Sequence, residues 1–376
     1  MSLTAFRGTQ IFDGETLHDG CALLLRDGCC EGIVTTADLP DGCDTHHLDG
    51  GVISPGFVDL QVNGGGGVML NDDPSVETLE VMAKAHRSLG VAGFLPTLIT
   101  DTRVRSQAAI GAVAEAINEG VEGIMGLHLE GPHLSVARKG AHDGDLIRPM
   151  DDADLAMLLD AAKRLPNVKM TVAPESVTEA QVAAMAEAGV IVSLGHTDAD
   201  FDTCQRWIDA GATCVTHLYN AMSQLGNREP GCLGATLSNG AVSAGLIADG
   251  IHVHPAAIKT ALSAKQGPGQ IFLVSDAMAV AGSDATEFTL NNRQILRRDG
   301  RLTLADGTLA GADLDLAQAV RVLVQQVDVD LAQALAMATT IPAGLLRDDQ
   351  GLGRFTKGKK IRPVWLDRAL YLRDLP

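Results

Sequence analysis

The chain has few aromatic residues, no cysteine pair of the CxxC type and no apolar run long enough to cross a bilayer. Aromatic side chains make up 3% of its 376 residues, and the seven cysteines lack the spacing of a zinc ribbon. We therefore expect reduced, mostly buried thiols rather than a disulfide framework. The apolar runs fall short of the roughly 18 residues of a transmembrane helix. The first residues also lack the basic flank and apolar core of a signal peptide. The sequence thus predicts a cytoplasmic protein with no membrane partner.

Positive charge is scarce as well. The chain has 29 Lys and Arg against 47 Asp and Glu, for a formal net charge of −18. This balance disfavours nucleic acid and anionic membranes as partners, because both repel an acidic protein. A small anionic substrate would need a local basic pocket. What the chain does contain is 46% hydrophobic residues, which suffices for a large buried core.

The two ends of the chain have the pattern of β-structure. Short alternating runs at 5–12, 21–26 and 32–35 are separated by Asp-Gly turns, a pattern typical of hairpins. Strand-like runs return at 361–366 and 370–372. Because chain ends often lie close together, we expect residues 1–54 and 345–376 to form one small β-sandwich domain.

Residues 55–344 alternate between apolar runs and helical patterns. The eight predicted strands lie at 56–62, 93–98, 124–129, 168–173, 190–194, 212–216, 243–248 and 271–274. Helical patterns separate most of them, at 76–89, 103–118, 152–164, 179–188, 201–210 and 255–264. Eight such repeats predict an α/β fold, a (β/α)8 TIM-like barrel. The stretch 286–309 breaks the pattern and predicts a β-hairpin excursion near the site.

Titratable residues follow several of the predicted strands. Glu130 ends the third, His196 and His217 follow the fifth and sixth, His252 follows the seventh, and Asp276 follows the eighth. A barrel brings all these strand ends to one rim. One carboxylate and two imidazoles can hold a hydrolytic zinc ion with an open position for water, and Asp276 could move a proton. The alternative is a set of unrelated polar residues in loops or at helix starts.

The first strand carries amides instead of further imidazoles. Gln61 and Asn63 bind divalent metals weakly compared with histidine, so we expect one tightly bound metal ion rather than two. The alternative for Gln61 and Asn63 is hydrogen bonding within the rim, where they would orient water or ligands.

At these residues the chain resembles the amidohydrolase superfamily and, within it, the deacetylases of N-acetylated sugar phosphates. The resemblance covers nearly the whole chain. Its motifs are SPGFVDLQVNG (54–64), PTLIT (96–100), HLEGPHL (128–134), KGAH (139–142), APE (173–175), SLGHT (193–197), THLYNAM (216–222), REPG (228–231), DGIH (249–252), SDAM (275–278) and LAG (309–311). The resemblance weakens only after Lys359, where Lys360-Ile361-Arg362-Pro363 replaces the usual Ala-Asp-Leu-Val.

The resemblance implies roles for individual residues. It implies one divalent metal ion per subunit at Glu130, His196 and His217, with Zn²⁺ as first choice and Fe²⁺, Mn²⁺ or Co²⁺ as alternatives. It implies that Asp276 is the catalytic acid and base, and that His142 contacts the acyl carbonyl. The positions that would contact substrate are Ala141, His142, Asn220, Ala221, Arg228, Asp249, Gly250, Ile251, His252, Leu309, Ala310 and Gly311.

The activity implied is hydrolysis of N-acetyl-D-glucosamine 6-phosphate to D-glucosamine 6-phosphate and acetate, in amino-sugar catabolism and cell-wall sugar recycling. Arg228 is the first candidate for the phosphate and His252 the second, because a guanidinium forks onto phosphate oxygens. The resemblance also implies a homodimer. Two other hypotheses remain at this stage. One is a different metal-dependent amidohydrolase, such as a cyclic amidase or nucleobase deaminase, and the other is a non-catalytic binding protein on the same barrel.

Overall fold

The larger part of the molecule is a barrel of eight parallel strands. The computed structural model describes residues 3–290 and 293–376. Hydrogen-bonded neighbours follow the order β17-β16-β15-β14-β13-β12-β11-β8, and a parallel bridge from Val62 to Ala277 brings the two ends of this sheet together. The strands are β8 (Phe57–Val62), β11 (Val91–Ile99), β12 (Leu127–Glu130), β13 (Val168–Val172), β14 (Ile191–Leu194), β15 (Cys214–Val215), β16 (Ser243–Leu246) and β17 (Ile271–Leu273). The predicted barrel is confirmed.

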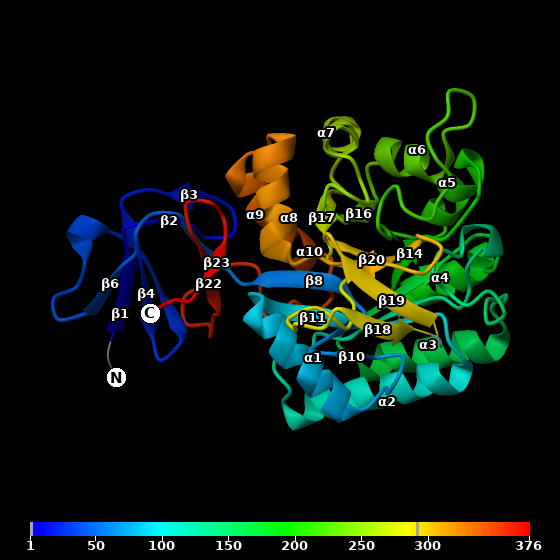
Figure 1. Cartoon of the computed structure of the whole chain (residues 1–376), viewed down its shortest axis with the longest axis horizontal. Coiled ribbons are helices and arrows are strands. Elements are labelled where there is room, and N and C mark those ends of the chain that lie inside the picture. Colours follow the sequence, from blue (N-terminus) through cyan, green and yellow to red (C-terminus); the bar gives the residue numbers. More distant parts are fainter. Residues whose placement is uncertain (1–2, 291–292) are drawn as a thin grey trace.

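Helices surround the barrel (Figure 1). Several begin where the sequence supplies a side-chain cap: Asp151 and Thr178 each form a capping box with the residue three positions on. The apolar faces of the helices and the strands form one large core. The helices are α1 (Val76–Ser88), α2 (Arg103–Glu119), α3 (Asp152–Arg164), α4 (Glu179–Glu187), α5 (Phe201–Asp209), α6 (Gly231–Ser238), α7 (Pro255–Ala264), α8 (Leu316–Val322), α9 (Leu331–Ala338) and α10 (Thr340–Ala343). Short 3-10 helices are η1 (Thr36–Asp38) and η2 (Val136–Arg138), and η3 (Leu323–Val327) is a π-helix. None of the helices in the described ranges is long and apolar enough to cross a membrane.

The two chain ends meet in a β-sandwich beside the barrel (Figure 1). Its core contains Phe6, Ile11, Leu23 and Ile53, and Trp365 of the C-terminal segment packs against it. One sheet has the order β5-β4-β1-β6 and the other β23-β22-β7-β2-β3, so the C-terminal strands pair with N-terminal ones. The strands are β1 (Leu3–Arg7), β2 (Gln10–Phe12), β3 (Leu17–His18), β4 (Cys21–Arg26), β5 (Cys29–Thr35), β6 (Asp44–His47), β7 (Val52–Pro55), β22 (Pro363–Leu366) and β23 (Leu372–Arg373). The predicted sandwich of both termini is confirmed.

A four-stranded antiparallel sheet lies over the barrel rim, and we call it the flap. It comprises β18 (Glu287–Leu290), β19 (Arg293–Arg298), β20 (Arg301–Thr303) and β21 (Leu309–Ala312), in that order. Asp299 and Gly300 form its central turn with φ of 51° and 71°, which is the two-residue hairpin geometry. A small ribbon of β9 (Gly64–Gly65) and β10 (Val68–Met69) also follows the first barrel strand. The excursion predicted at 286–309 is therefore larger than one hairpin.

Candidate active site

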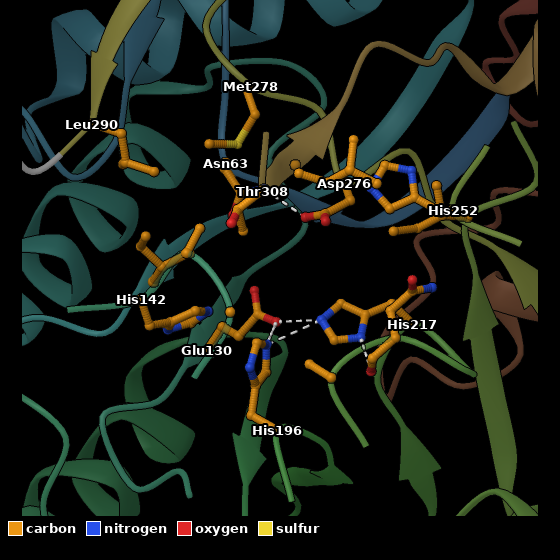
Figure 2. Close-up of a pocket in the computed structure, with 18 residues that line it drawn as sticks. Asn63, Glu130, His142, His196, His217, His252, Asp276, Met278, Leu290 and Thr308 are labelled. Atoms are coloured by element: carbon orange, nitrogen blue, oxygen red, sulfur yellow. Dashed lines mark hydrogen bonds and ion pairs between the residues drawn. The ribbon is translucent and has the colours of Figure 1, made fainter. Parts of the chain in front are cut away.

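A cavity of about 260 Å³ opens at the C-terminal ends of the barrel strands, under the flap (Figure 2). Twelve of the residues predicted for the site line it: Asn63, Glu130, Ala141, His142, His196, His217, Asn220, Ala221, His252, Asp276, Leu309 and Gly311. The barrel thus brings together residues that lie up to 248 positions apart in the chain, from Asn63 to Gly311. The geometry of these side chains decides what the cavity can do.

Three acceptor atoms converge at the centre of the cavity. Glu130 Oε1 lies 3.1 Å from His196 Nε2 and 3.1 Å from His217 Nε2, and the two ring nitrogens are 3.1 Å apart. The other ring nitrogen of each histidine faces a backbone carbonyl, at 2.8 Å for His196 and 3.1 Å for His217. A carbonyl only accepts, so each Nδ1 carries a proton, and in a neutral ring the Nε2 atom presents a lone pair.

Lone pairs that face one another at such distances need a cation between them. Two ligand atoms about 2.0–2.1 Å from a tetrahedral Zn²⁺ are separated by roughly 3.3 Å, close to the spacing found here. Ligand atoms of Glu130, His142 and His196 also lie within 4.8 Å of one another. We favour His217 over His142 as the third donor, because its Nε2 lies 3.1 Å from both of the other donor atoms. The donor set fits a single divalent metal ion.

The backbone at the rim is held in an uncommon conformation. His196, His217 and Asp276 have φ of 49°, 28° and 49°, in the left-handed region that residues other than glycine seldom adopt. His196 and His217 lie two residues beyond the end of a barrel strand, and Asp276 lies three residues beyond. Such strain persists where the surrounding structure enforces it, and it is found most often at functional sites.

Two amides on the first strand hold the carboxylates in place. Gln61 Nε2 donates to Glu130 Oε2 at 3.0 Å and to Asp276 Oδ1 at 3.2 Å, and Asn63 Nδ2 donates to Asp276 Oδ1 at 2.7 Å. The amides therefore bond within the rim, as in the second interpretation of Gln61 and Asn63. Burial, together with the charge of Glu130, raises the pKa of Asp276, which favours a carboxyl that can take up and return a proton. Burial opposes ionisation of Glu130 too, but the adjacent His196 and His217 hold the pKa of Glu130 well below its usual value.

His142 is a neutral hydrogen-bond donor aimed into the cavity. Its Nδ1 lies 2.7 Å from Thr100 Oγ1 and accepts from the backbone N–H of Thr100 at 3.4 Å. The neutral ring therefore carries its proton on Nε2. Burial and the nearby His196 lower the pKa of His142 to about 3, so the ring stays uncharged at neutral pH. A neutral N–H donor can stabilise negative charge that develops on a carbonyl oxygen.

His252 is fixed by Asp249. Its Nδ1 lies 2.6 Å from Asp249 Oδ2, while Asp249 Oδ1 accepts from the backbone N–H groups of Ile251 and His252. Of the predicted DGIH residues only His252 lines the cavity, and Asp249 orients it. Ala310 is fully buried, between the lining residues Leu309 and Gly311.

Arg228 is one of the predicted site residues that do not line the cavity. It is exposed, in the loop between Met222 and α6. Conversely, the sequence interpretation missed four large apolar residues that line the cavity, namely Ile99, Ile247, Met278 and Leu290. Ile99 and Met278 lie inside the quoted PTLIT and SDAM motifs, and their positions in those motifs were a usable signal.

Comparison with known proteins places the chain. The profile described as "Amidohydrolase family" matches residues 52–364, and the chain belongs to that family. It is similar to an N-acetylgalactosamine-6-phosphate deacetylase of Shewanella sp. (strain ANA-3), 42% identical over 96% of this chain and 91% of the other. It is similar to an N-acetylglucosamine-6-phosphate deacetylase of Haemophilus influenzae, 35% identical over 90% and 88%. A crystal structure of the N-acetylglucosamine-6-phosphate deacetylase from Pasteurella multocida superimposes with a TM-score of 0.92 at 33% identity, covering 98% and 97%.

Proposed function

We propose that this protein is a metal-dependent deacetylase that hydrolyses N-acetyl-D-glucosamine 6-phosphate to D-glucosamine 6-phosphate and acetate in the cytoplasm. The observation that carries the proposal is the set of three converging acceptors, Glu130, His196 and His217, beside the buried carboxyl of Asp276. This arrangement suits hydrolysis of a bond that needs both an activated water and proton transfer to the leaving group. Membership of the amidohydrolase family and the names of the relatives support an N-acetylated sugar phosphate as substrate.

Glu130, His196 and His217 would hold one divalent metal ion per subunit, with Zn²⁺ as first choice and Fe²⁺, Mn²⁺ or Co²⁺ as alternatives. When bound, the ion would lower the pKa of water and polarise the acyl carbonyl. One ion rather than two is supported by Gln61 and Asn63, whose amide nitrogens donate to the carboxylates. Amide groups used in this way offer no strong second ligand set.

The protein residues divide the reaction between them. Asp276 accepts a proton from the attacking water, whose oxygen forms the new bond to the acyl carbon. His142 Nε2–H donates to the acyl oxygen as negative charge develops there. Asp276 then returns the proton to the amide nitrogen, the carbon–nitrogen bond breaks, and acetate and the free amine result.

The phosphate would bind at the end of the cavity that carries His252. We propose that the chain forms a homodimer in which the loop with Arg228 reaches the cavity of the neighbouring subunit. Two features support this: Arg228 is exposed and away from its own cavity, and Leu225 of the same loop exposes 56% of its surface. A charge-assisted guanidinium–phosphate contact contributes about 1.5–3 kcal/mol, or roughly tenfold to a hundredfold in affinity.

We also propose that residues 1–54 and 345–376 form one domain and that residues 55–344 form the other.

N-Acetyl-D-galactosamine 6-phosphate is the second candidate substrate, because the relative that shares 42% identity carries that name. Acetate release from both sugar phosphates and from unphosphorylated N-acetylglucosamine, with and without a chelator, tests the proposal. We expect chelator-sensitive release from at least the glucosamine derivative. Activity on the galactosamine derivative alone would make that sugar phosphate the substrate, and no release from either would overturn the deacetylase assignment.

Arg228→Ala should raise KM for the phosphorylated sugar and leave the rate on the unphosphorylated sugar nearly unchanged. Arg228→Lys should recover part of the loss.

A further inference from the structure

The cavity has two chemically different ends. Leu290 and His142 lie on one side of Glu130 and His217 and His252 on the other, while Met278 lies above Asn63 (Figure 2). Ile99, Met278 and Leu290 form what we call the apolar wall, all three lining the cavity with at most 5% of their surface exposed. The opposite end presents the imidazole of His252. Ile247 also lines the cavity, but it packs in the barrel core and not in the apolar wall. The two ends therefore favour different parts of a substrate.

The apolar wall is a packed structure and not a loose lining. Its three residues come from the end of β11, the segment after β17 and the end of β18, and they share one hydrophobic cluster with Met69, Leu302 and others. The flap is also tied to the segment that carries His142, because the Arg293 guanidinium donates to the Ala141 carbonyl. Close-packed groups of this kind yield little when an additional methylene must be accommodated.

The reacting amide must lie between these ends, with its acyl carbon near Glu130, Asp276 and His142. A sugar phosphate carries hydroxyl groups and negative charge, which would be costly to bury against apolar side chains. The sugar therefore extends toward His252, and the acyl substituent points the other way. Resting on the function proposed above, we infer that the apolar wall is the acyl subsite and that Leu290 and Ile99 restrict the substrate to a short acyl group.

The test uses glucosamine 6-phosphate that carries N-acetyl, N-propionyl or N-butyryl groups, with kcat/KM measured for each. An apolar pocket discriminates about 10- to 200-fold for one methylene. We expect the full-length wild-type enzyme to lose at least about tenfold from acetyl to propionyl, and more with butyryl. Leu290→Ala should raise the propionyl-to-acetyl ratio by about tenfold or more, and Ile99→Ala should act in the same direction.

Leu302→Ala is the matched control. Leu302 lies in the same hydrophobic cluster and is fully buried, but it does not line the cavity, so its truncation loosens the flap without enlarging the subsite. The propionyl-to-acetyl ratio of this variant should stay at the wild-type value.

Three results would overturn the inference while leaving deacetylation intact. They are a wild-type enzyme that accepts butyryl as well as acetyl, Leu290→Ala and Ile99→Ala variants that both keep the wild-type ratio, and a Leu302→Ala variant that shifts the ratio as much as Leu290→Ala. Failure of the wild-type enzyme to release any acyl group would instead contradict the proposed function itself.

Discussion

The barrel interior contains two layers of buried polar residues that differ in how their hydrogen bonds are satisfied. In the rim layer, Glu130, His196 and His217 direct acceptors at one another. In the layer below, Thr97 bonds to His128 at 3.2 Å, His128 to Thr171 at 2.8 Å, and Thr171 through Thr216 to Ser193 at 2.7 Å each. Both layers are buried, so burial of polar groups does not by itself mark a site. Acceptors that face one another without a proton donor do.

The two layers also differ in backbone conformation. His196, His217 and Asp276 adopt positive φ beyond the strand ends, whereas His128 and Thr171 lie within regular paired strands. The strain at the rim costs stability and places side chains where chemistry can occur. The lower layer favours stability over chemistry, because its hydroxyl groups pair with one another and with His128. Substitutions in the rim should therefore affect activity most, and substitutions below it should affect stability most.

The largest contrast should come from two histidine-to-alanine variants. His196→Ala removes a proposed ligand, so bound metal should be lost and kcat/KM should fall by about 10³-fold or more, since a metal ion supplies several kcal/mol to the transition state. His128→Ala should keep the metal and lose about 2 kcal/mol or more of unfolding free energy, through a cavity and unpaired hydroxyl groups. Metal emission spectroscopy, acetate release and urea unfolding measure these quantities. If the His128 variant lost the metal and the His196 variant kept it, the lower layer and not the rim would hold the metal.

Within the rim, Asp276→Asn should separate proton transfer from metal binding. The amide keeps the size of the carboxyl but cannot accept the water proton, so we expect kcat to fall by about 10²- to 10⁴-fold. Metal content and thermal midpoint should stay near the wild-type values, because Asp276 is not among the three converging acceptors. Turnover within a few-fold of wild type would show that another group transfers the proton.

The sequence predicted the barrel because its strands are apolar runs of ordinary length, separated by helical patterns. It also located the titratable residues just past those runs, where a barrel gathers them. It could not separate the two layers. His128 and Glu130 lie two positions apart on β12 and so share one face of the strand, with only the point where the strand ends deciding which of them reaches the rim.

Contacts that join distant segments lay beyond the sequence as well. Leu290 belongs to the flap, and nothing in its local pattern shows that it shares a hydrophobic cluster with Ile99 of β11. Arg228 shows the same limit in reverse. Its motif predicts a contact with the substrate, yet the fold of the chain leaves Arg228 in an exposed loop.

His86, on helix α1, is buried outside the barrel strands. It tests whether the loss of unfolding free energy at low pH comes from the rim histidines alone. His86 Nε2 lies 2.8 Å from the Gly64 carbonyl, and burial lowers the pKa of His86 from 6.5 to about 4. Between these values the unfolded chain binds a proton that the folded chain does not, so unfolding becomes easier as pH falls. The loss between pH 6.5 and 4 should be about 3 kcal/mol.

His86→Gln, which cannot take up a proton, should show a shallower fall in unfolding free energy over this pH range than wild type. Urea unfolding at several pH values, with metal saturating in both proteins, measures the difference. Equal slopes for the two proteins would assign the acid sensitivity to other groups, the rim histidines first among them.

We expect the smallest change in unfolding free energy at Lys169, a residue of the lower layer whose hydrogen bonds are not satisfied within the described part of the chain. Lys169, on β13, is fully buried, and its Nζ has no hydrogen-bond partner among the residues that the structure describes. The nearby Asp59 is a poor counter-ion, because it accepts backbone N–H groups of Gln61 and Ser275 and burial raises its pKa to about 7. Burial also lowers the pKa of Lys169, which disfavours its charged form.

An unpaired buried amine costs stability, so Lys169→Met, which nearly keeps the length of the side chain, should raise the unfolding free energy by about 1 kcal/mol. Lys169→Ala is the matched comparison, since it removes the same amine but leaves a cavity and should be destabilising. If the lower layer serves packing alone, Lys169→Met keeps kcat/KM within about twofold of wild type. A large fall in kcat with metal content and stability intact would instead show that the unpartnered amine acts on the rim through its charge, and the division between the two layers would then fail at this residue.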